Sequence, residues 1–211
     1  MTIKERYAGV LDYFQRTQPE PTTELEYSDP FGLLVAVMLS AQCTDKRVNM
    51  VTPALFAAYP TPESLAAATS DEVFEYIKSV SYPRSKAEHL VQMAQRLVSA
   101  FHGIVPDNID DLQTLQGVGR KTANVVCAVI WNQPTMAVDT HIFRVSERLG
   151  LTTNSKNPLQ TERQLVKYIP AEIIPKAHHW LLLHGRYICQ ARKPKCEQCG
   201  LREYCRFFSK K

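Results

Sequence analysis

The chain has 211 residues, of which 45% are hydrophobic and 22% are charged. A chain of this length forms one or two domains and buries about 70% of its unfolded surface, so it needs no disulfides for stability. The composition excludes a disordered or collagen-like chain and is typical of a globular protein.

The net charge of +4 is distributed unevenly along the sequence. Residues 184–211 carry eight Lys and Arg against two Glu, whereas the rest of the chain carries 17 basic and 19 acidic side chains. The basic C-terminal segment is either a solvated tail or a surface for an anionic partner, such as nucleic acid or membrane lipid.

The longest apolar stretch, residues 31–39, is nine residues long, far shorter than the roughly 20 that a membrane-spanning helix needs. Lys4, Glu5 and Arg6 interrupt the N-terminus before an apolar region can form. We therefore expect no signal peptide, no membrane partner and a cytoplasmic location.

Apolar residues recur at helical spacing in residues 31–39, again in residues 90–101, and from Leu112 to Val118. Sustained alternation with period two is missing, and Pro and Gly separate the helical stretches. The sequence predicts an all-α protein of about ten short helices. Because proline stops a helix, Pro134 marks a possible domain break.

The segment Gly117-Val118-Gly119 joins two of these helical stretches. Glycines permit positive φ and close approach of the backbone, and Val118 can fill the gap between the helices. The N–H groups at the start of the following helix, together with its macrodipole, favour an anion. This helix-hairpin-helix pattern predicts DNA-phosphate binding, and the alternative is a tight turn between two helices.

Two charged residues follow the hairpin. Lys121 lies in the first turn of the next helix, where the positive end of the dipole disfavours a cation, and we expect it to be partly buried there. Asp139 precedes a helical stripe formed by Ile142, Val145 and Leu149, so it is a natural N-cap. An Asp in that position is most often structural, and spacing alone does not pair it with Lys121.

Four of the six cysteines lie close together near the C-terminus, at positions 189, 196, 199 and 205. Only one Cys-x2-Cys pair is present, where a structural zinc site usually has two, so the spacing favours an iron-sulfur cluster. Zinc, and less readily disulfides or free thiols, stay as alternatives. Cys43 and Cys127 lie in apolar helical stretches and are expected to be buried. Between Cys189 and Cys196 lies a basic loop that includes Arg192 and Lys193.

Several segments together resemble one known family: residues 21–25, 39–45, the hairpin, 137–145, 178–186 and the four cysteines. These segments span essentially the whole chain, which resembles the bacterial endonuclease III family of DNA glycosylases and apurinic/apyrimidinic (AP) lyases. The resemblance implies an all-α fold of two helical domains flanking a DNA cleft.

The resemblance also implies a domain division and a cofactor. Residues 22–132 would form a six-helix domain containing the helix-hairpin-helix motif, at about residues 109–128. Residues 1–21 and 133–211 would form a second domain with a 4Fe-4S cluster held by Cys189, Cys196, Cys199 and Cys205.

In the implied mechanism the damaged pyrimidine is flipped out of the duplex. Lys121 attacks C1′ and Asp139 assists, giving a Schiff base and β-elimination. The implied partner is double-stranded DNA containing oxidised pyrimidines or abasic sites, bound by a monomer. DNA-contact residues carried over from the family, or expected from the hairpin and the basic loop, are Gln42, Tyr82, Gly117, Val118, Gly119, Arg120, Arg192 and Lys193.

The chain departs from the family at Tyr82, where the usual residue is an apolar wedge. An aromatic ring can stack on bases with about 1–3 kcal/mol each, so a wedge role is retained in our prediction.

Two other functions compete with this prediction. A monofunctional, mismatch-type glycosylase would share the hairpin and the cluster but would not need an amine at Lys121. A non-catalytic DNA-binding module with a structural metal would keep the glycines and cysteines and have no use for Lys121 with Asp139.

Overall fold

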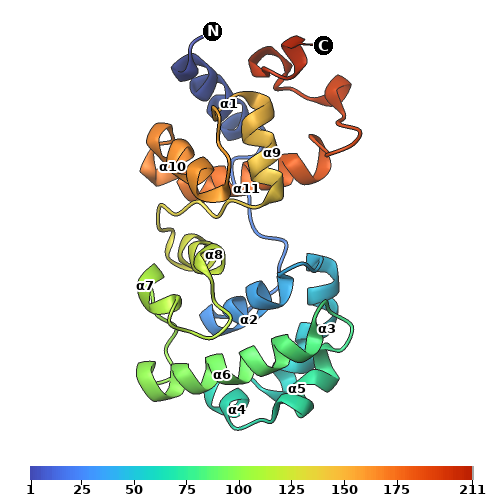
Figure 1. Ribbon diagram of the computed structural model, residues 1–211, viewed down its shortest axis with the longest axis vertical. Coiled ribbons are helices and arrows are strands. Elements are labelled where there is room, and N and C mark those ends of the chain that lie inside the picture. Colours follow the sequence, from blue (N-terminus) through green and yellow to red (C-terminus); the bar gives the residue numbers. More distant parts are fainter. Residues whose placement is uncertain (211) are drawn as a thin grey trace. The chain divides into compact units, whose positions relative to one another are not determined.

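The computed structural model describes residues 1–210, and all regular structure in this range is helical (Figure 1). The all-α prediction is therefore confirmed. None of the described helices combines the length and the apolar character that crossing a membrane requires. The chain forms two compact units, residues 24–131 and residues 1–23 joined with the chain from residue 132 onward.

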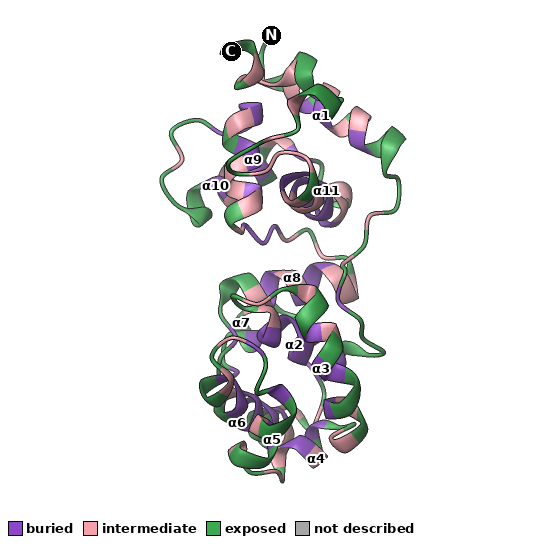
Figure 2. Ribbon diagram, turned by 90° about the vertical axis from the view of Figure 1, so that its right-hand side faces the viewer, coloured by how far each residue is buried: buried purple, intermediate pink, exposed green. Residues whose placement is uncertain are grey.

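The unit of residues 24–131 is built around one buried helix. Every residue from Phe31 to Leu39 of this helix, α2 (Pro30–Ser40), is buried. It packs against α3 (Asp45–Ala58), α6 (Pro83–Phe101) and α8 (Arg120–Trp131) (Figure 2). Asp29 caps its start by accepting a hydrogen bond from the Gly32 N–H at 2.8 Å. The helices of this unit are α2 (Pro30–Ser40), α3 (Asp45–Ala58), α4 (Pro62–Ala66), α5 (Ser70–Ile77), α6 (Pro83–Phe101), α7 (Ile109–Leu112) and α8 (Arg120–Trp131).

The second unit has its own core, centred on Trp180. The Trp180 ring is fully buried and stacks on Phe14 with the ring centres 5.7 Å apart, while its Nε1 donates to the Gln18 carbonyl at 2.6 Å. The N-terminal helix is thereby docked onto a helix more than 150 residues later in the chain. The helices of this unit are α1 (Ile3–Thr17), α9 (Thr140–Leu149), α10 (Pro158–Tyr168), η1 (Ala171–Ile173) and α11 (Ile174–Tyr187).

After α11 the chain forms only short 3₁₀ turns, η2 (Cys196–Gln198), η3 (Arg202–Tyr204) and η4 (Phe208–Lys210). Backbone bonds tie this segment to α9, because the Phe207 N–H donates to the Arg148 carbonyl at 2.9 Å. The Tyr204 ring lies directly against Gly9 of α1, where a Cβ atom would have no room. These contacts position the region that carries four cysteines.

Candidate functional site

The hairpin connects α7 to α8 through residues 113–119. Gly117 has a φ of +77°, and a Cβ there would lie 2.9 Å from the Cβ of His89, so both backbone conformation and space require glycine. Val118 is buried in the core of its unit.

Gly119 differs from our expectation, because its φ is not positive and a Cβ would meet nothing within 4 Å. The chain reverses at Gly117, and Gly119 already belongs to the start of α8, since its carbonyl accepts from the Ala123 N–H at 3.0 Å. The glycine therefore leaves open space beside the first turn of α8, where helical N–H groups point outward.

Lys121 lies in the first turn of α8 and is exposed, as is Arg120 before it. We expected Lys121 to be partly buried, and this prediction is wrong. Lys121 lies on the first turn of α8, directly after the exposed residues of the hairpin, and is itself exposed. Its position on the first helical turn agrees with the sequence prediction.

Asp139 is the N-cap of α9, as predicted. It is half-buried, and its Oδ1 accepts from the Ile142 N–H at 2.8 Å. Within residues 1–210, its second carboxylate oxygen has no hydrogen-bond partner. Asp139 and Lys121 belong to different compact units.

Gln42 and Tyr82, which lie forty residues apart in sequence, share one pocket. Both have left-handed backbones, with φ values of 53° and 52°, and the Ser81 hydroxyl donates to the Gln42 carbonyl at 2.5 Å. Tyr82 is 65% exposed. A non-glycine residue in this conformation costs roughly 1–2 kcal/mol, and such strain often occurs at functional sites. The pocket is also lined by His89 and Gly117.

Lys86 is a supporting residue of this pocket that the sequence analysis missed. It is 9% exposed, and its Nζ donates to the carbonyls of Leu39 and Ala41, each at 2.7 Å. Burial lowers the pKa of Lys86. Lys86 therefore caps the C-terminal end of α2 and fixes the residue before Gln42. The helical spacing of the sequence could have indicated its burial, because Lys86 lies four residues before Leu90, on the buried face of α6.

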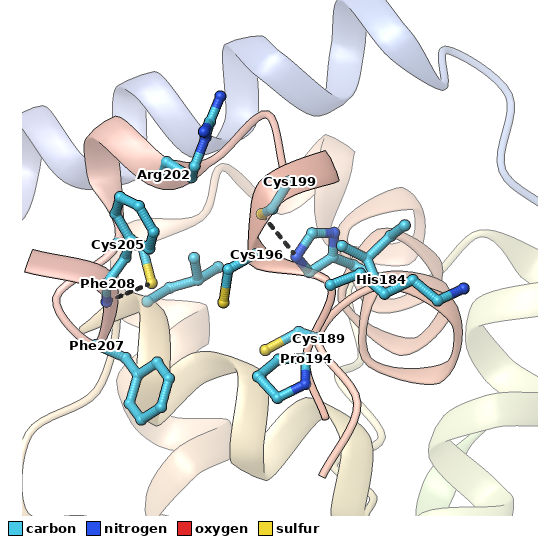
Figure 3. Close-up of a pocket in the computed structure, with 12 residues that line it drawn as sticks. His184, Cys189, Pro194, Cys196, Cys199, Arg202, Cys205, Phe207 and Phe208 are labelled. Carbon is cyan, nitrogen blue, oxygen red and sulfur yellow. Dashed lines mark hydrogen bonds between the residues drawn. The ribbon is translucent and has the colours of Figure 1, made fainter. Parts of the chain in front are cut away.

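The four C-terminal cysteines line one cavity (Figure 3). The rest of its wall is mainly apolar and comes from Leu149, Ile188, Pro194, Phe207 and Phe208. The thiols surround this cavity rather than one point, since no three His, Cys, Asp or Glu side chains of the described chain are placed to hold a single ion. No disulfide joins the described cysteines.

The surroundings of the sulfur atoms fit an iron-sulfur cluster. The Phe208 N–H points at Cys205 Sγ from 3.4 Å (Figure 3). Arg148 Nη1 lies 3.6 Å from Cys189 Sγ. Burial, and then the neighbouring thiols, raise the pKa of Cys199. Four thiolates in an apolar cavity need a cationic group to take up their charge, and N–H groups directed at sulfur are typical of clusters.

Arg144 connects the helix that begins at Asp139 with the first of these cysteines. Its Nε donates to the Cys189 carbonyl at 3.1 Å, and its Nη2 donates to the Gly185 carbonyl at 2.8 Å. Arg192 and Lys193 follow Cys189 on the loop and are both exposed. The structure thus places the cysteines, the basic loop and the Asp139 helix in one unit.

Comparisons with known families agree with this geometry. Residues 35–171 match the HhH-GPD superfamily of base excision DNA repair proteins. Residues 189–205, which include all four clustered cysteines, match the iron-sulfur binding domain of endonuclease III.

Similar proteins extend along the whole chain. Endonuclease III of Rickettsia felis is 46% identical over 95% of this chain and 93% of its own. Endonuclease III of Escherichia coli K12 is 44% identical over 98% of both chains. A solved structure of a trapped endonuclease III–DNA covalent intermediate, an estranged-adenine complex, superposes with a TM-score of 0.93 at 41% identity, covering 100% of this chain and 99% of that one.

Proposed function

The chain belongs to the endonuclease III family of base-excision repair enzymes, which are DNA N-glycosylases and AP lyases, and from this premise we propose that Lys121 and Asp139 carry its chemistry. The supporting observation is that Lys121 is exposed on the first turn of α8, immediately after the hairpin, where Gly119 leaves open space beside the helix start. Asp139 supports the same proposal, because its N-cap bond engages one carboxylate oxygen and leaves the other available.

In the proposed reaction, DNA delivers a nucleotide flipped out of the duplex. The neutral amine of Lys121 attacks C1′, and the glycosidic bond breaks as the base departs with its electron pair. Asp139 accepts a proton and stabilises the positive charge that develops on the sugar. Transfer of a proton to O4′ and cleavage of the C1′–O4′ bond open the sugar ring and give a Schiff base between Lys121 and C1′. The Schiff base then permits loss of a C2′ proton, and the C3′–O bond breaks so that the 3′ phosphate leaves. Water finally releases the enzyme.

The proposal includes two kinds of contact with DNA phosphate, one from the start of α8 and one from the basic loop. Gly117, Val118, Gly119 and Arg120 present the start of α8 to a phosphate, which fixes the register of the duplex without reading its sequence. Arg192 and Lys193 add two cations on a loop that is closed at its base, since the Lys195 N–H donates to the Ile188 carbonyl at 2.9 Å.

Gln42 and Tyr82 act on the bases in this proposal. The strained, exposed Tyr82 ring stacks against a base as the wedge, and Gln42 enters the space that the flipped nucleotide leaves. Because the ring offers a stacking face that an aliphatic wedge lacks, the preference for the opposite base is expected to differ from that of relatives with an apolar wedge.

The chain binds a 4Fe-4S cluster. We assign Cys189, Cys196, Cys199 and Cys205 as its ligands, on the evidence of their shared cavity. In this proposal the cluster holds the ends of the basic loop. We further propose that the substrate is DNA with oxidised pyrimidines or abasic sites, and that the enzyme acts as a cytoplasmic monomer on chromosomal DNA.

Borohydride reduction tests the assignment of Lys121. The wild-type protein is expected to become covalently attached to DNA containing an abasic site, because hydride reduces the Schiff base to a stable amine. Lys121→Ala is expected to abolish attachment, while Lys156→Ala, at an exposed lysine in the second unit, keeps it. The attached species is measured on a denaturing gel.

The same experiment separates the competing functions. A monofunctional glycosylase would release a damaged base without trapping, and a binding module would do neither. Equal trapping by wild type and Lys121→Ala would remove Lys121 from the mechanism. The capture of a 41% identical relative as a covalent DNA intermediate favours the lyase.

A further inference from the structure

Arg148 reaches from α9 into the loop between Cys189 and Cys196. Its Nη1 donates to the Gln190 carbonyl at 2.7 Å, and its Nη2 donates to the Ala191 carbonyl at 2.8 Å. The planar fork of a guanidinium can satisfy two consecutive carbonyls at once, which the single ammonium of a lysine does less well. The side chain therefore holds the backbone at the beginning of the basic loop.

The other side of Arg148 is held by the C-terminal segment. Its guanidinium carbon lies 4.9 Å from the centre of the Phe207 ring, and its backbone carbonyl accepts from the Phe207 N–H at 2.9 Å. Stacking on one face and two hydrogen bonds along the edge leave this side chain little freedom. Arg148 thus links α9, the loop and the chain after Cys205.

Arg192 and Lys193, the two cations that we assign to DNA phosphate, come directly after Ala191 in the sequence. Arg192 and Lys193 are exposed, and neither side chain has a hydrogen bond or ion pair to another residue in the range 1–210. Their backbone is held before them by Arg148 and after them by the bond from Lys195 to Ile188. A loop that is already ordered loses little conformational entropy when its side chains bind.

We propose that Arg148 is a positioning residue for DNA binding, which holds residues 190–191 so that Arg192 and Lys193 meet phosphate from a preformed loop. This inference rests on the DNA-binding role proposed for the loop. Arg148 acts here through the loop backbone, whereas the cysteines hold the ends of the segment, and its Nη1 also lies 3.6 Å from Cys189 Sγ at the first of these ends.

Trypsin tests the loop without DNA, because the Arg192–Lys193 bond is a cleavage site inside it. Cleavage at this bond is expected to be slow in the wild type and about tenfold faster in Arg148→Met, since local opening exposes the bond. Arg148→Lys keeps the charge, loses the fork, and is expected to be cleaved at an intermediate rate. Arg163→Met is the matched control, because it removes an exposed arginine from α10 of the same unit.

Cluster absorbance near 400 nm is recorded for each variant. Wild-type cleavage rates in Arg148→Met with full absorbance would overturn the proposal. Should Arg148→Met fail to fold, Arg148→Lys carries the test. Loss of the cluster from both variants would also overturn it, because Arg148 would then act on the cluster site.

A double-mutant cycle on DNA tests the coupling. Arg148→Met is expected to weaken binding to an abasic-site analogue about tenfold, and Arg192→Ala is expected to cost much less in that background than in the wild type. Fully additive effects would contradict a positioning role. If the wild type did not bind such DNA, the proposed function would fail while the trypsin result still reported on the loop.

Discussion

Two buried polar side chains, Lys86 and His179, differ in whether hydrogen bonds compensate their burial. Lys86 is buried but forms two hydrogen bonds to the end of α2, so its burial supports the pocket beside Gln42. His179 is buried without such compensation, because its Nδ1 has no hydrogen-bond partner among residues 1–210. A buried polar group of this kind is a local source of instability.

The stability of the protein is expected to fall in mild acid because of His179. Burial lowers the pKa of His179 from 6.5 to about 4. The unfolded chain binds this proton more readily than the folded chain, so the contribution is present above pH 6.5 and is lost as the pH falls towards 4. For His179 alone the loss between pH 7 and pH 5 is about 2 kcal/mol. Urea unfolding at the two pH values measures it as the difference between the wild type and His179→Leu, since burial also lowers the pKa of His184 to about 4.

His179→Leu removes the titrating group, so its unfolding free energy should depend less on pH in this range. His102→Leu is the control, because His102 is exposed on the other unit and should keep the wild-type dependence. An unchanged dependence in His179→Leu would contradict the assignment.

Helix α9 begins after Asp139 and carries Arg144 and Arg148, which reach the cysteine segment. Its close approach to α11 depends on a glycine. A Cβ at Gly185 would lie 2.8 Å from His141 Cβ and 2.9 Å from Val145 Cγ2. These atoms belong to short, packed side chains that have little freedom to move. The approach also brings the Gly185 carbonyl within reach of Arg144. Helix packing therefore determines how the chain after Asp139 meets the cysteine region.

Gly185→Ala is expected to destabilise the protein by about 1–3 kcal/mol, because the added methyl group forces α9 and α11 apart. Gly119→Ala is the matched control, since a Cβ there meets nothing within 4 Å, and its stability should stay close to that of the wild type. Thermal or urea unfolding measures both. Equal stability of the two variants would show that the contact between α9 and α11 adjusts freely.

The molecule as a whole contains two separate hydrophobic cores, one for each unit. The cluster region belongs to only one of them. It lies against α1 at two points, where Tyr204 covers Gly9 and Tyr13 covers Gly200. Loss of the cluster should therefore also loosen α1, which is distant in sequence from the cysteines and is not part of the other core.

Iron removal is expected to increase hydrogen exchange in residues 189–208 and in α1, because both lose the same supporting segment. Exchange in α2 and α6 should stay unchanged, since these helices belong to the other core. Hydrogen exchange with mass spectrometry, before and after chelation, measures this. Equal loss of protection in α2 would show that the two units unfold together.

Local patterns determined the helical class, the hairpin and the Asp139 cap, because periodicity, glycine and capping act within a few residues. The cysteine spacing likewise indicated one shared site, since four thiols in so short a segment have few ways to lie apart. The exposure of Lys121 was not predicted, because burial depends on what covers a residue and not on its neighbours in sequence.

Only the tertiary structure decided how distant segments meet. The docking of α1 on Trp180, the shared pocket of Gln42 and Tyr82, and the reach of Arg148 into the basic loop all join residues at least 35 positions apart. Such contacts depend on core packing and on individual side-chain geometry, which leave no periodic signal. The basic C-terminal charge of the sequence thus indicated an anionic partner, and the fold showed that Arg148 and the surrounding backbone hold the loop that carries that charge.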